Sequence, residues 1–514
     1  MVFSSSVFLF LFLPLVLILY YLALRRWRQG QNVFLLLASL GFYAWGEPVY
    51  VALMVASMLA NWLFGLKVGE GRPHRRLWLA ASLAFNLAVL GFFKYEGFLA
   101  QNLNALLGAA VIPDLELPLP IGISFYTLQA VSYVVDAYRG HVAPQRNVLY
   151  LGMYIAMFPQ LVAGPIVRYS TIEEQVLDRR EDLRGFSQGV RLFAVGLAKK
   201  CLLANTVAVL ADQMLAGGGS SIGAVGAWAG IVAFAFQIYF DFSGYSDMAI
   251  GLGMMFGFRY LRNFNYPYIA RSATEFWRRW HISLGSFFRD YVYIPLGGNR
   301  CGRRRWLLNL MLVWGLTGVW HGAAWNFVLW GLFYGLLLVV EKTWLLERMG
   351  RLPSLARHLY GIAVFAFGWL IFWIEDPSML VEYLLALGGA FGATGTSTAW
   401  ELGAWAYWPV FLICAIASTP VLPWLRAKAV ERAGGPSAQG FLENDLPGER
   451  RLSVDGICDA QSWLEALPAD ARPSGRVAVH ALGIAADVGA LALIGLSVLG
   501  VVAGTFNPFI YFRF

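Results

Sequence analysis

Apolar stretches long enough to cross a lipid bilayer recur along the whole sequence. A transmembrane helix needs about 20 predominantly apolar residues, because the hydrocarbon core is about 30 Å thick. Only 14% of the 514 residues are charged and 58% are hydrophobic, whereas soluble domains carry about 25% charged residues. The clearest spanning candidates are Val7–Leu24, Leu77–Phe93, Ile222–Phe240, Gly361–Ile374, Ala404–Leu425 and Val488–Thr505.

Four further apolar stretches are interrupted by Gly or Pro, namely Val33–Leu66, Leu119–Val135, Leu151–Val167 and Trp306–Val340. When the longer stretches are counted as more than one helix, both sets together give roughly a dozen helices of spanning length. We therefore predict an all-α fold, a polytopic transmembrane helical bundle.

The basic residues near the N-terminus indicate how the chain is oriented. Val7–Leu24 is preceded by no positive charge and followed by no small-residue cleavage site, so we expect a retained anchor and not a signal peptide. The positive-inside rule places Arg25–Arg28 in the cytosol and the N-terminus outside. Val33–Leu66 is then expected to form a hairpin that turns at Gly46–Pro48 and returns to a second basic loop, Lys67–Arg76.

A hydrophilic block late in the chain, Arg426–Arg476, is rich in Gly, Pro, Ala and charges of both signs. This composition predicts a loop or a small excursion outside the membrane. We divide the chain accordingly. Residues 1–425 form the transmembrane bundle, 426–476 the extramembrane loop, and 477–514 a C-terminal transmembrane helix and tail.

The segment Arg259–Arg305 is strongly basic. It holds ten Arg residues against Glu275 and Asp290, and this excess of eight positive charges equals the net charge of the whole chain. The positive-inside rule places the segment on the cytosolic face. The charge is explained either by topology and lipid-headgroup contact or by docking of an anionic cytosolic ligand.

A helix start is predicted within this basic segment. Ser272-x-x-Glu275 matches the capping box, in which each side chain satisfies a free N–H at the beginning of a helix. A helix from about Ala273 would place Trp277 and His281 on one face, because they are four residues apart. Aromatic residues interleaved with arginines suit a helix that lies in the membrane interface.

Two carboxylates, Asp241 and Asp247, lie within an apolar stretch. A charged side chain at membrane depth costs about 2.5–3.5 kcal/mol on insertion scales, so such residues face a cavity or find a partner. The hydroxyls of Ser243 and Ser246 could satisfy these carboxylates locally. Buried polar packing and the wall of a functional site explain the two aspartates equally well.

His321 lies near the middle of an uncharged run. No Asp, Glu, Lys or Arg occurs from Trp306 to Val340, and these 35 residues are too many for one span, so we predict two short helices broken near Gly322. Gly318 and Gly322 form a G-x-x-x-G pattern that allows close helix approach, and the spacing would place Trp325 beside His321. Because imidazole can accept and donate a proton, His321 is either a packing residue or a functional group facing a lumen.

No metal site is expected from the sequence. None of the six histidines pairs at His-x-x-x-His spacing. The four cysteines form no C-x-x-C pair, and we expect them to be packing residues. They are Cys201, Cys301, Cys414 and Cys458.

These features leave two classes of protein open. One is an integral-membrane enzyme that works at His321 and His281. The other is a transporter or channel whose intramembrane Asp and His residues carry ions or substrate. The sequence contains no P-loop and no G-x-S-x-G nucleophile motif.

Several stretches resemble one known family. They are LPIGISFYTLQAVSYVVDAYRG (119–140), FPQLVAGPIVRY (158–169), the segment 237–300 that contains EFWRRWHIS, GVWHGAAWNFVLWG (318–331) and the closing NPFIYFRF (507–514). Together with the opening MVFSSSVFLFLFLPLVLILYYL, they resemble the membrane-bound O-acyltransferase (MBOAT) family, of the alginate O-acetyltransferase membrane-subunit type. The resemblance covers most of residues 1–345 and the extreme C-terminus, and residues 380–505 match no motif.

The resemblance implies a fold and a set of site residues. It implies a helical bundle around a central channel, with re-entrant or broken helices and a catalytic region at residues 237–331. His321 matches the family's near-invariant histidine and is expected to act as general base, and His281 matches its second histidine, deeper on the cytosolic side. The candidate substrate-binding residues are Asp241, Asp247, Trp277, Asn326, Arg303 and Arg304.

The resemblance also implies substrates and partners. Acetyl-CoA would be the donor substrate, with no bound cofactor and no metal. The acetyl group would cross the bacterial inner membrane and reach an exopolysaccharide, alginate-like or cellulose-like, through a periplasmic transferase of the SGNH serine-hydrolase type. We expect contacts with membrane lipid and with the exopolysaccharide machinery, and none with nucleic acid.

Overall fold

The computed structural model describes residues 1–391, 403–432, 473–504 and 509–510. The elements in these ranges are helices, which confirms the all-α class. Within these ranges, seven helices are long and apolar enough to cross a membrane, or eight if a bent pair counts as one span. The described residues therefore hold fewer spans than the roughly dozen helices expected from the sequence. The seven are Tyr50–Val68, Arg75–Leu107, Leu183–Gly217, Gly219–Met255, Trp325–Met349, Ser354–Trp373 and Gly475–Ala503.

Two of the interrupted apolar stretches account for part of the difference, because they are buried in short helices. Val7–Leu24, expected to span the membrane, also forms a shorter apolar helix, Phe8–Ala23, that is not among the seven. Residues 119–135 contribute to α5 (Ile123–Arg139), and residues 151–167 to α6 (Val148–Ala156) and α7 (Phe158–Leu161). Seven of the nine residues of α6 and all four of α7 are buried. A helix that is apolar all round can lie in a protein interior as well as in lipid, and here the protein surrounds it.

The first apolar stretch folds as a helical run with two π-helical parts, η1 (Phe8–Phe12), α1 (Leu13–Ile18) and η2 (Leu19–Ala23). α2 (Arg28–Ala44) and α3 (Tyr50–Val68) then form the predicted hairpin, with its turn at residues 45–49.

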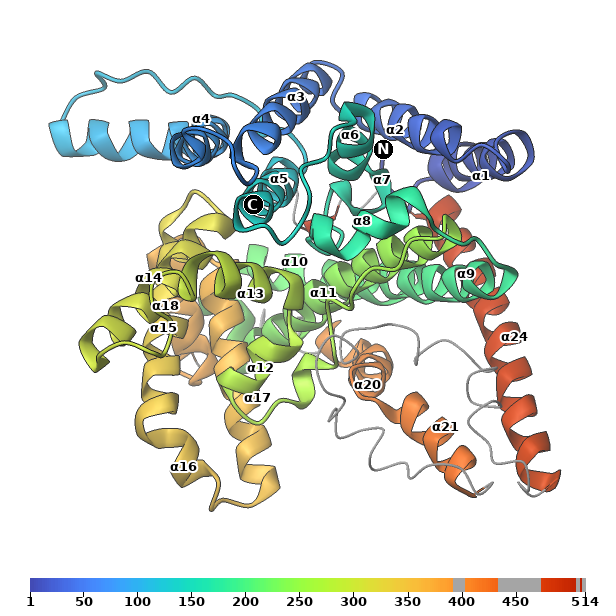
Figure 1. Cartoon of the computed structure of the whole chain (residues 1–514). Coiled ribbons are helices and arrows are strands. Elements are labelled where there is room, and N and C mark those ends of the chain that lie inside the picture. Colours follow the sequence, from blue (N-terminus) through green and yellow to red (C-terminus); the bar gives the residue numbers. More distant parts are fainter. Residues whose placement is uncertain (392–402, 433–472, 505–508, 511–514) are drawn as a thin grey trace.

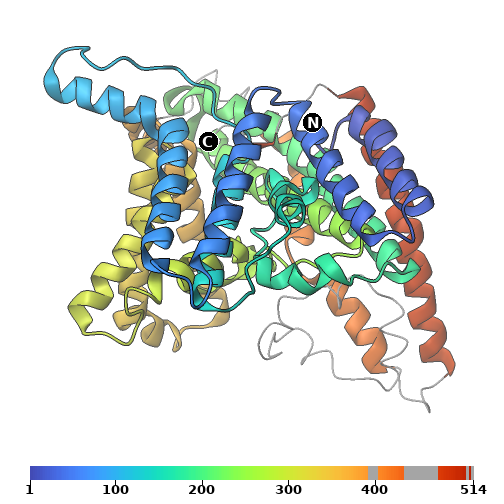
Figure 2. The same cartoon turned by 45° about the horizontal axis from the view of Figure 1, so that its top comes forward.

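The two ends of the bundle are easily seen in Figure 2. The N-terminus and the connection from α4 (Arg75–Leu107) to α5 lie at one end, and the connection from α3 to α4 lies at the other. Following the positive-inside rule, we call the first the outer end and the second the inner end. The basic loop Lys67–Arg76 is at the inner end.

The centre of the bundle is built on α11 (Gly219–Met255), which packs against three preceding segments (Figure 1): α9 (Leu183–Ala198), η3 (Lys199–Ala204) and α10 (Asn205–Gly217). Facing glycines bring α9 and α11 to backbone contact. A Cβ on Gly196 would lie 2.5 Å from the carbonyl oxygen of Gly244, and a Cβ on Gly244 would lie 2.7 Å from that of Gly196. Gly189 and Gly251 repeat the arrangement two turns away. Small residues of this kind allow close helix packing in membranes.

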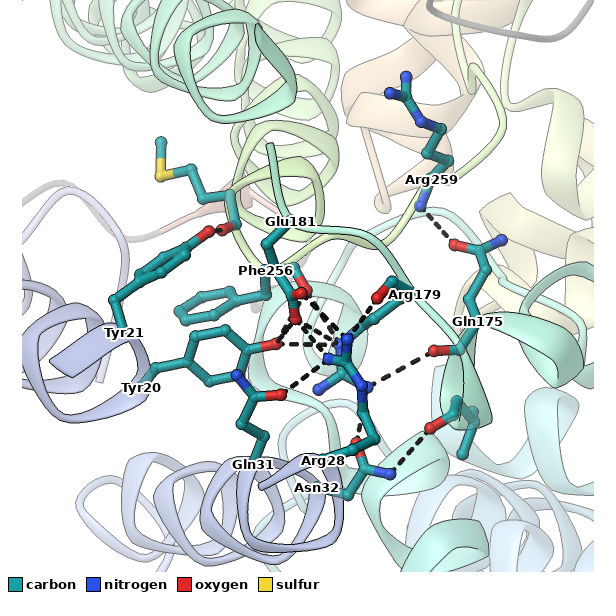
Figure 3. Close-up of polar contacts among 12 residues, drawn as sticks. Tyr20, Tyr21, Arg28, Gln31, Asn32, Gln175, Arg179, Glu181, Phe256 and Arg259 are labelled. Atoms are coloured by element: carbon teal, nitrogen blue, oxygen red, sulfur yellow. Dashed lines mark hydrogen bonds and ion pairs between the residues drawn. The ribbon is translucent and has the colours of Figure 1, made fainter. Parts of the chain in front are cut away.

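A buried polar cluster ties the first helices to the end of α11 (Figure 3). The guanidinium of Arg179 donates from Nε to the hydroxyl of Tyr20 at 3.0 Å and to the carbonyl oxygen of Phe256 at 3.1 Å. Glu181 accepts a hydrogen bond from Tyr20 at 2.6 Å and pairs with Arg28. A buried cation needs partners of this kind, so the cluster fixes the N-terminal helices relative to α11.

The basic segment after α11 folds into four short helices: η4 (Pro267–Ile269), α12 (Ala273–Arg279), α13 (Ile282–Phe288) and η5 (Arg289–Tyr293). An earlier helix, α8 (Tyr169–Leu177), lies beside the start of this segment. The predicted cap is present, since Ser272 Oγ accepts from the backbone N–H of Glu275 at 3.0 Å. The carboxylate of Glu275 accepts from the N–H of Arg271 instead of that of Ser272.

The second half of the bundle follows this segment: α14 (Arg303–His321), α15 (Trp325–Val340), η6 (Glu341–Leu345), α16 (Leu346–Met349), α17 (Ser354–Trp373) and α18 (Pro377–Leu387). α14 and α15 are the two helices predicted from the uncharged run, and the break is at Gly322 as expected. A Cβ on Gly318 would lie 2.3 Å from the carbonyl oxygen of Phe327 and 3.1 Å from Cα of Gly331. The close approach expected of Gly318 is therefore present.

The last part of the chain comprises α20 (Trp408–Ala417) and α21 (Val421–Arg432), bent by 55°, and α24 (Pro473–Ala503) at one edge of the bundle (Figure 1). Most of the predicted loop 426–476 lies outside the described residues. Phe509 and Ile510 return to the core, where each is 3% exposed.

Candidate active site

His321 is the last residue of α14, and its ring is enclosed by aromatic side chains. Gly322, the C-cap, has an extended backbone that turns the chain into α15. His321 is 4% exposed. Its ring centroid lies 5.0 Å from those of Trp320 and Trp330, and 5.4 Å from that of Phe372. The histidine therefore sits at a helix break inside the bundle.

His321 also lines a small cavity of about 70 Å³. The loop before α5 forms its opposite wall. Two larger cavities, of about 390 and 250 Å³, adjoin it through shared wall residues. One of them is lined by Met1 and Gly46, which belong to the outer end. The imidazole is thus approached from the outer end. The small cavity is lined by Lys94, Leu119, Pro120, Ile121, Gly122, Ile123, Ser124, Phe125, Val162, Trp320 and His321.

Lys94 of α4 holds the end of α14 in place. Its ammonium donates to the carbonyl oxygens of Trp320 at 2.6 Å and His321 at 3.2 Å. The last carbonyls of a helix have no partner within the helix, and a cation there also complements the helix dipole. In the sequence, Lys94 directly follows the apolar stretch Leu77–Phe93, a position typical of a residue at the end of a span, so the pattern gives no sign of this role.

His281 packs against the same tryptophan, Trp320, as His321 does. Its ring centroid is 6.0 Å from that of Trp320 and 4.7 Å from that of Phe242. His281 is 2% exposed. The structure therefore brings the two histidines together around one tryptophan.

The predicted helical face shared by Trp277 and His281 is wrong. α12 ends at Arg279, and His281 adopts a left-handed backbone (φ 44°, ψ 53°) before α13 begins. Trp277 instead packs against Trp314, Trp330 and Tyr334, with ring centroids 4.8–5.3 Å away. It supports the aromatic wall behind His321 and does not touch His281's ring.

Two further expectations concern α15. Trp325 does not lie beside His321, because it begins the next helix, is 59% exposed and contacts Asn102 and Phe98 of α4. Asn326 is buried and donates to the carbonyl oxygen of Phe372 at 3.0 Å. Asn326 therefore bonds to Phe372, whose ring packs against His321.

Asp241 and Asp247 are paired with lysines of η3. Lys200 Nζ lies 2.8 Å from Asp241 Oδ1, and Lys199 Nζ lies 2.6 Å from Asp247 Oδ2. Asp241 also accepts from the backbone N–H of Ile510 at 2.8 Å. The hydroxyls of Ser243 and Ser246, which the sequence suggested as partners, have no hydrogen-bond partner within the described part of the chain. The two carboxylates thus hold η3 and the C-terminal tail against α11.

Arg303 and Arg304 are exposed in the first turn of α14. They lie at the opposite end of that helix from His321, about 27 Å away at 1.5 Å per residue. These arginines are therefore not part of the histidine cavity, and any role in binding belongs to the inner end.

Two site residues carried no sequence signal. Asn263 contacts His281 from 18 positions earlier. Glu341 is 1% exposed and accepts from the backbone N–H groups of Ala273 and Thr274, the free first-turn donors of α12. Both act across long sequence separations, which periodicity does not reveal. Among the described residues no group of three or more His, Cys, Asp or Glu side chains could hold a metal ion.

The bundle of membrane-spanning helices places two buried histidines around one tryptophan, an arrangement that fits the integral-membrane enzyme among the two classes left open by the sequence. The family model for the membrane-bound O-acyltransferases matches residues 116–385. The chain belongs to this family and is an O-acyltransferase, which confirms the resemblance.

Curated relatives extend the match to the full length of the chain. The probable alginate O-acetylase AlgI of Azotobacter vinelandii is 38% identical over all of both chains. The protein of the same name from Pseudomonas putida is 44% identical over 73% of this chain and 78% of its own. The peptidoglycan O-acetyltransferase of Helicobacter pylori is 35% identical over 77% of this chain and 81% of its own.

Proposed function

We propose that this protein takes an acetyl group from cytosolic acetyl-CoA and passes it across the bacterial inner membrane for O-acetylation of an exopolysaccharide. Relatives of full length are named for alginate O-acetylation, which supports an alginate-like polymer, and a cellulose-like polymer remains the second candidate. The observation that carries the proposal is His321 at a helix break, lining a cavity that adjoins a larger one at the outer end, with His281 packed against the same tryptophan, Trp320.

The chemistry fits a neutral histidine. A hydroxyl is a weak nucleophile toward a thioester, and His321 within hydrogen-bond reach takes its proton as the new C–O bond forms. The C–S bond then breaks, and the same proton passes to the departing CoA thiolate. The aromatic enclosure excludes water that would otherwise hydrolyse the thioester.

The size of the cavity favours a relay. The cavity that His321 itself lines, of about 70 Å³, is much smaller than the two that adjoin it, and a long polymer could hardly be threaded to this buried imidazole. A single hydroxyl on a slender side chain fits. We therefore propose that a periplasmic transferase of the SGNH serine-hydrolase type receives the acetyl group and delivers it to the polymer.

The test is turnover by the purified protein in detergent. Given acetyl-CoA and the hydroxyl-bearing periplasmic partner, the enzyme should release free CoA, measured with a thiol reagent, in the absence of sealed membranes. A transporter would need two compartments and would leave the thioester intact. Strict dependence on a proton gradient with no CoA released would favour the transporter.

The His321→Ala variant tests the assignment of the base. Removing a general base lowers turnover by about 100-fold or more, while the protein should still insert and accumulate, because the cavity is already partly open. His480→Ala is the matched control, since His480 is exposed on α24. Near-parental CoA release by His321→Ala would show that His321 is a packing residue.

A further inference from the structure

The backbone around His281 is held by one residue from a distant part of the chain. Asn263 is 1% exposed. Its carbonyl oxygen accepts from the N–H of Ile282 at 2.9 Å, and its side-chain Oδ1 accepts from the N–H of Ser283 at 3.1 Å. These contacts flank His281, whose left-handed backbone is uncommon for a non-glycine residue and requires support from the surrounding structure.

The same Oδ1 lies 3.2 Å from Nδ1 of His281. Oxygen and nitrogen of an Asn amide are assigned from their hydrogen-bond partners. Here the backbone N–H of Ser283 can only donate, and the Ser283 hydroxyl, which itself accepts from the N–H of Ile166 at 3.0 Å, lies 2.9 Å from the same atom. The atom that faces His281 Nδ1 is therefore the oxygen, an acceptor.

The acceptor decides where the imidazole carries its proton. Two lone pairs at 3.2 Å would repel each other, so Nδ1 of His281 must bear a hydrogen that it donates to Asn263 Oδ1. Burial lowers the pKa of His281 to about 3, so the ring is neutral and carries only one proton. Its second nitrogen, Nε2, then has a free lone pair.

That lone pair is not used by the described part of the protein. Nε2 of His281 is buried and has no hydrogen-bond partner among the residues that the structure describes. Phe242 and Phe125 flank the ring and cannot donate to it, and the indole N–H of Trp320, the third ring against His281, makes no hydrogen bond to Nε2. Leaving a buried acceptor without a hydrogen-bond donor costs free energy. This cost points to a substrate N–H or O–H as the missing donor.

We propose that Asn263 is a positioning residue that fixes the Nδ1–H tautomer of His281, so that Nε2 accepts a hydrogen bond from the substrate during acyl transfer. The inference rests on the proposed function and deepens it. It gives His281 a role distinct from that of His321, namely holding the reacting group in place, and it gives Asn263 a role in turnover that is more than packing.

The test compares two substitutions of similar size. Asn263→Asp keeps an acceptor opposite Nδ1, as the carboxylate partners of many functional histidines do, and should retain kcat within about threefold of the parent. Asn263→Leu removes the acceptor, and because a wrongly protonated histidine loses its function, kcat should fall about tenfold or more. KM for acetyl-CoA should change little in either. Ser286→Ala is the control, since the Ser286 hydroxyl donates within α13, to the carbonyl oxygen of Ser283 at 2.8 Å.

The amount of membrane-inserted protein is measured for each variant, because a structural role would lower that amount and not kcat. Equal kcat losses in Asn263→Asp and Asn263→Leu, or parental kcat in Asn263→Leu, would overturn the proposal. If Asn263→Leu does not accumulate, Asn263→Asp decides alone. A tenfold loss of kcat in an accumulating Asn263→Asp protein would contradict it, and retained kcat would support it. Absence of CoA release by the parent would instead refute the proposed function.

Discussion

Lys94 shows how one side chain can control the geometry of a site that it does not form alone. Its ammonium is bonded to the last two carbonyl oxygens of α14, at Trp320 and His321. Charge-assisted hydrogen bonds of this type contribute about 1.5–3 kcal/mol when the partners are buried. Without the lysine these carbonyls would have to find water or shift, and the His321 ring would shift with them.

We therefore expect Lys94→Met to lower kcat about tenfold, which corresponds to ~1.4 kcal/mol of transition-state stabilisation, and to lower the thermal midpoint. Lys94→Arg keeps a cation and should lose less. Lys67→Met is the matched control, because Lys67 is exposed on α3. Turnover and melting temperature are measured in detergent. Indistinguishable values for Lys94→Met and Lys67→Met would show that the helix end does not need the lysine.

At the scale of elements, α9 and α11 depend on glycines that face each other. Ala in place of Gly244 would bring a Cβ to 2.7 Å from the carbonyl oxygen of Gly196, closer than van der Waals contact. Overpacking of this kind costs about 1–3 kcal/mol. We expect Gly244→Ala to lower the thermal midpoint, whereas Gly91→Ala in α4, with open space around it, should not. Equal midpoints for the two variants would contradict the packing argument.

The helix break at His321 could be predicted from the sequence, and the surroundings of His281 could not. The uncharged run of 35 residues exceeds one span and contains Gly318 and Gly322, so length and small residues alone locate the break. His281 looked like the continuation of a capped helix because periodicity assumes a regular backbone. Its left-handed conformation is supported by Asn263, a contact made only in the folded chain.

Long-range partners limited the prediction of the aspartates in the same way. Asp241 and Asp247 have serines nearby in sequence, yet their lysine partners are 41 and 48 positions away. A sequence pattern shows only residues that are close along the chain. A buried carboxylate, however, is stabilised by a cation that the folded structure brings within hydrogen-bond distance, whatever its sequence separation. The spans themselves were predictable because bilayer thickness fixes their length. The number of spans could not be predicted, because most apolar residues of α5, α6 and α7 are buried inside the protein and not in contact with lipid.

At the scale of the whole molecule, the histidine cavity and the basic segment lie at opposite ends of α14. His321 lies at the end of this helix that faces the outer cavity, and Arg303 and Arg304 lie in the first turn at the inner end. The basic segment to which they belong has an excess of eight positive charges. Under the proposed function, a donor with several phosphates would be held at the inner end, and its acyl group would meet the acceptor about 27 Å away along the helix.

This separation gives the last prediction. If Arg303 and Arg304 bind the phosphates of acetyl-CoA, the Arg303→Gln/Arg304→Gln variant should raise KM for acetyl-CoA several-fold with little change in kcat, because contacts remote from the carbonyl are made equally in the ground and transition states. Both side chains are exposed, so the effect should shrink with added salt, as screening shortens to about 8 Å at physiological ionic strength. Arg25→Gln/Arg26→Gln is the control, since it removes the same charge from exposed positions at the inner end and outside the basic segment. If the segment serves only topology, both double variants will keep the parental KM at low salt, because enough positive charge remains to hold the orientation.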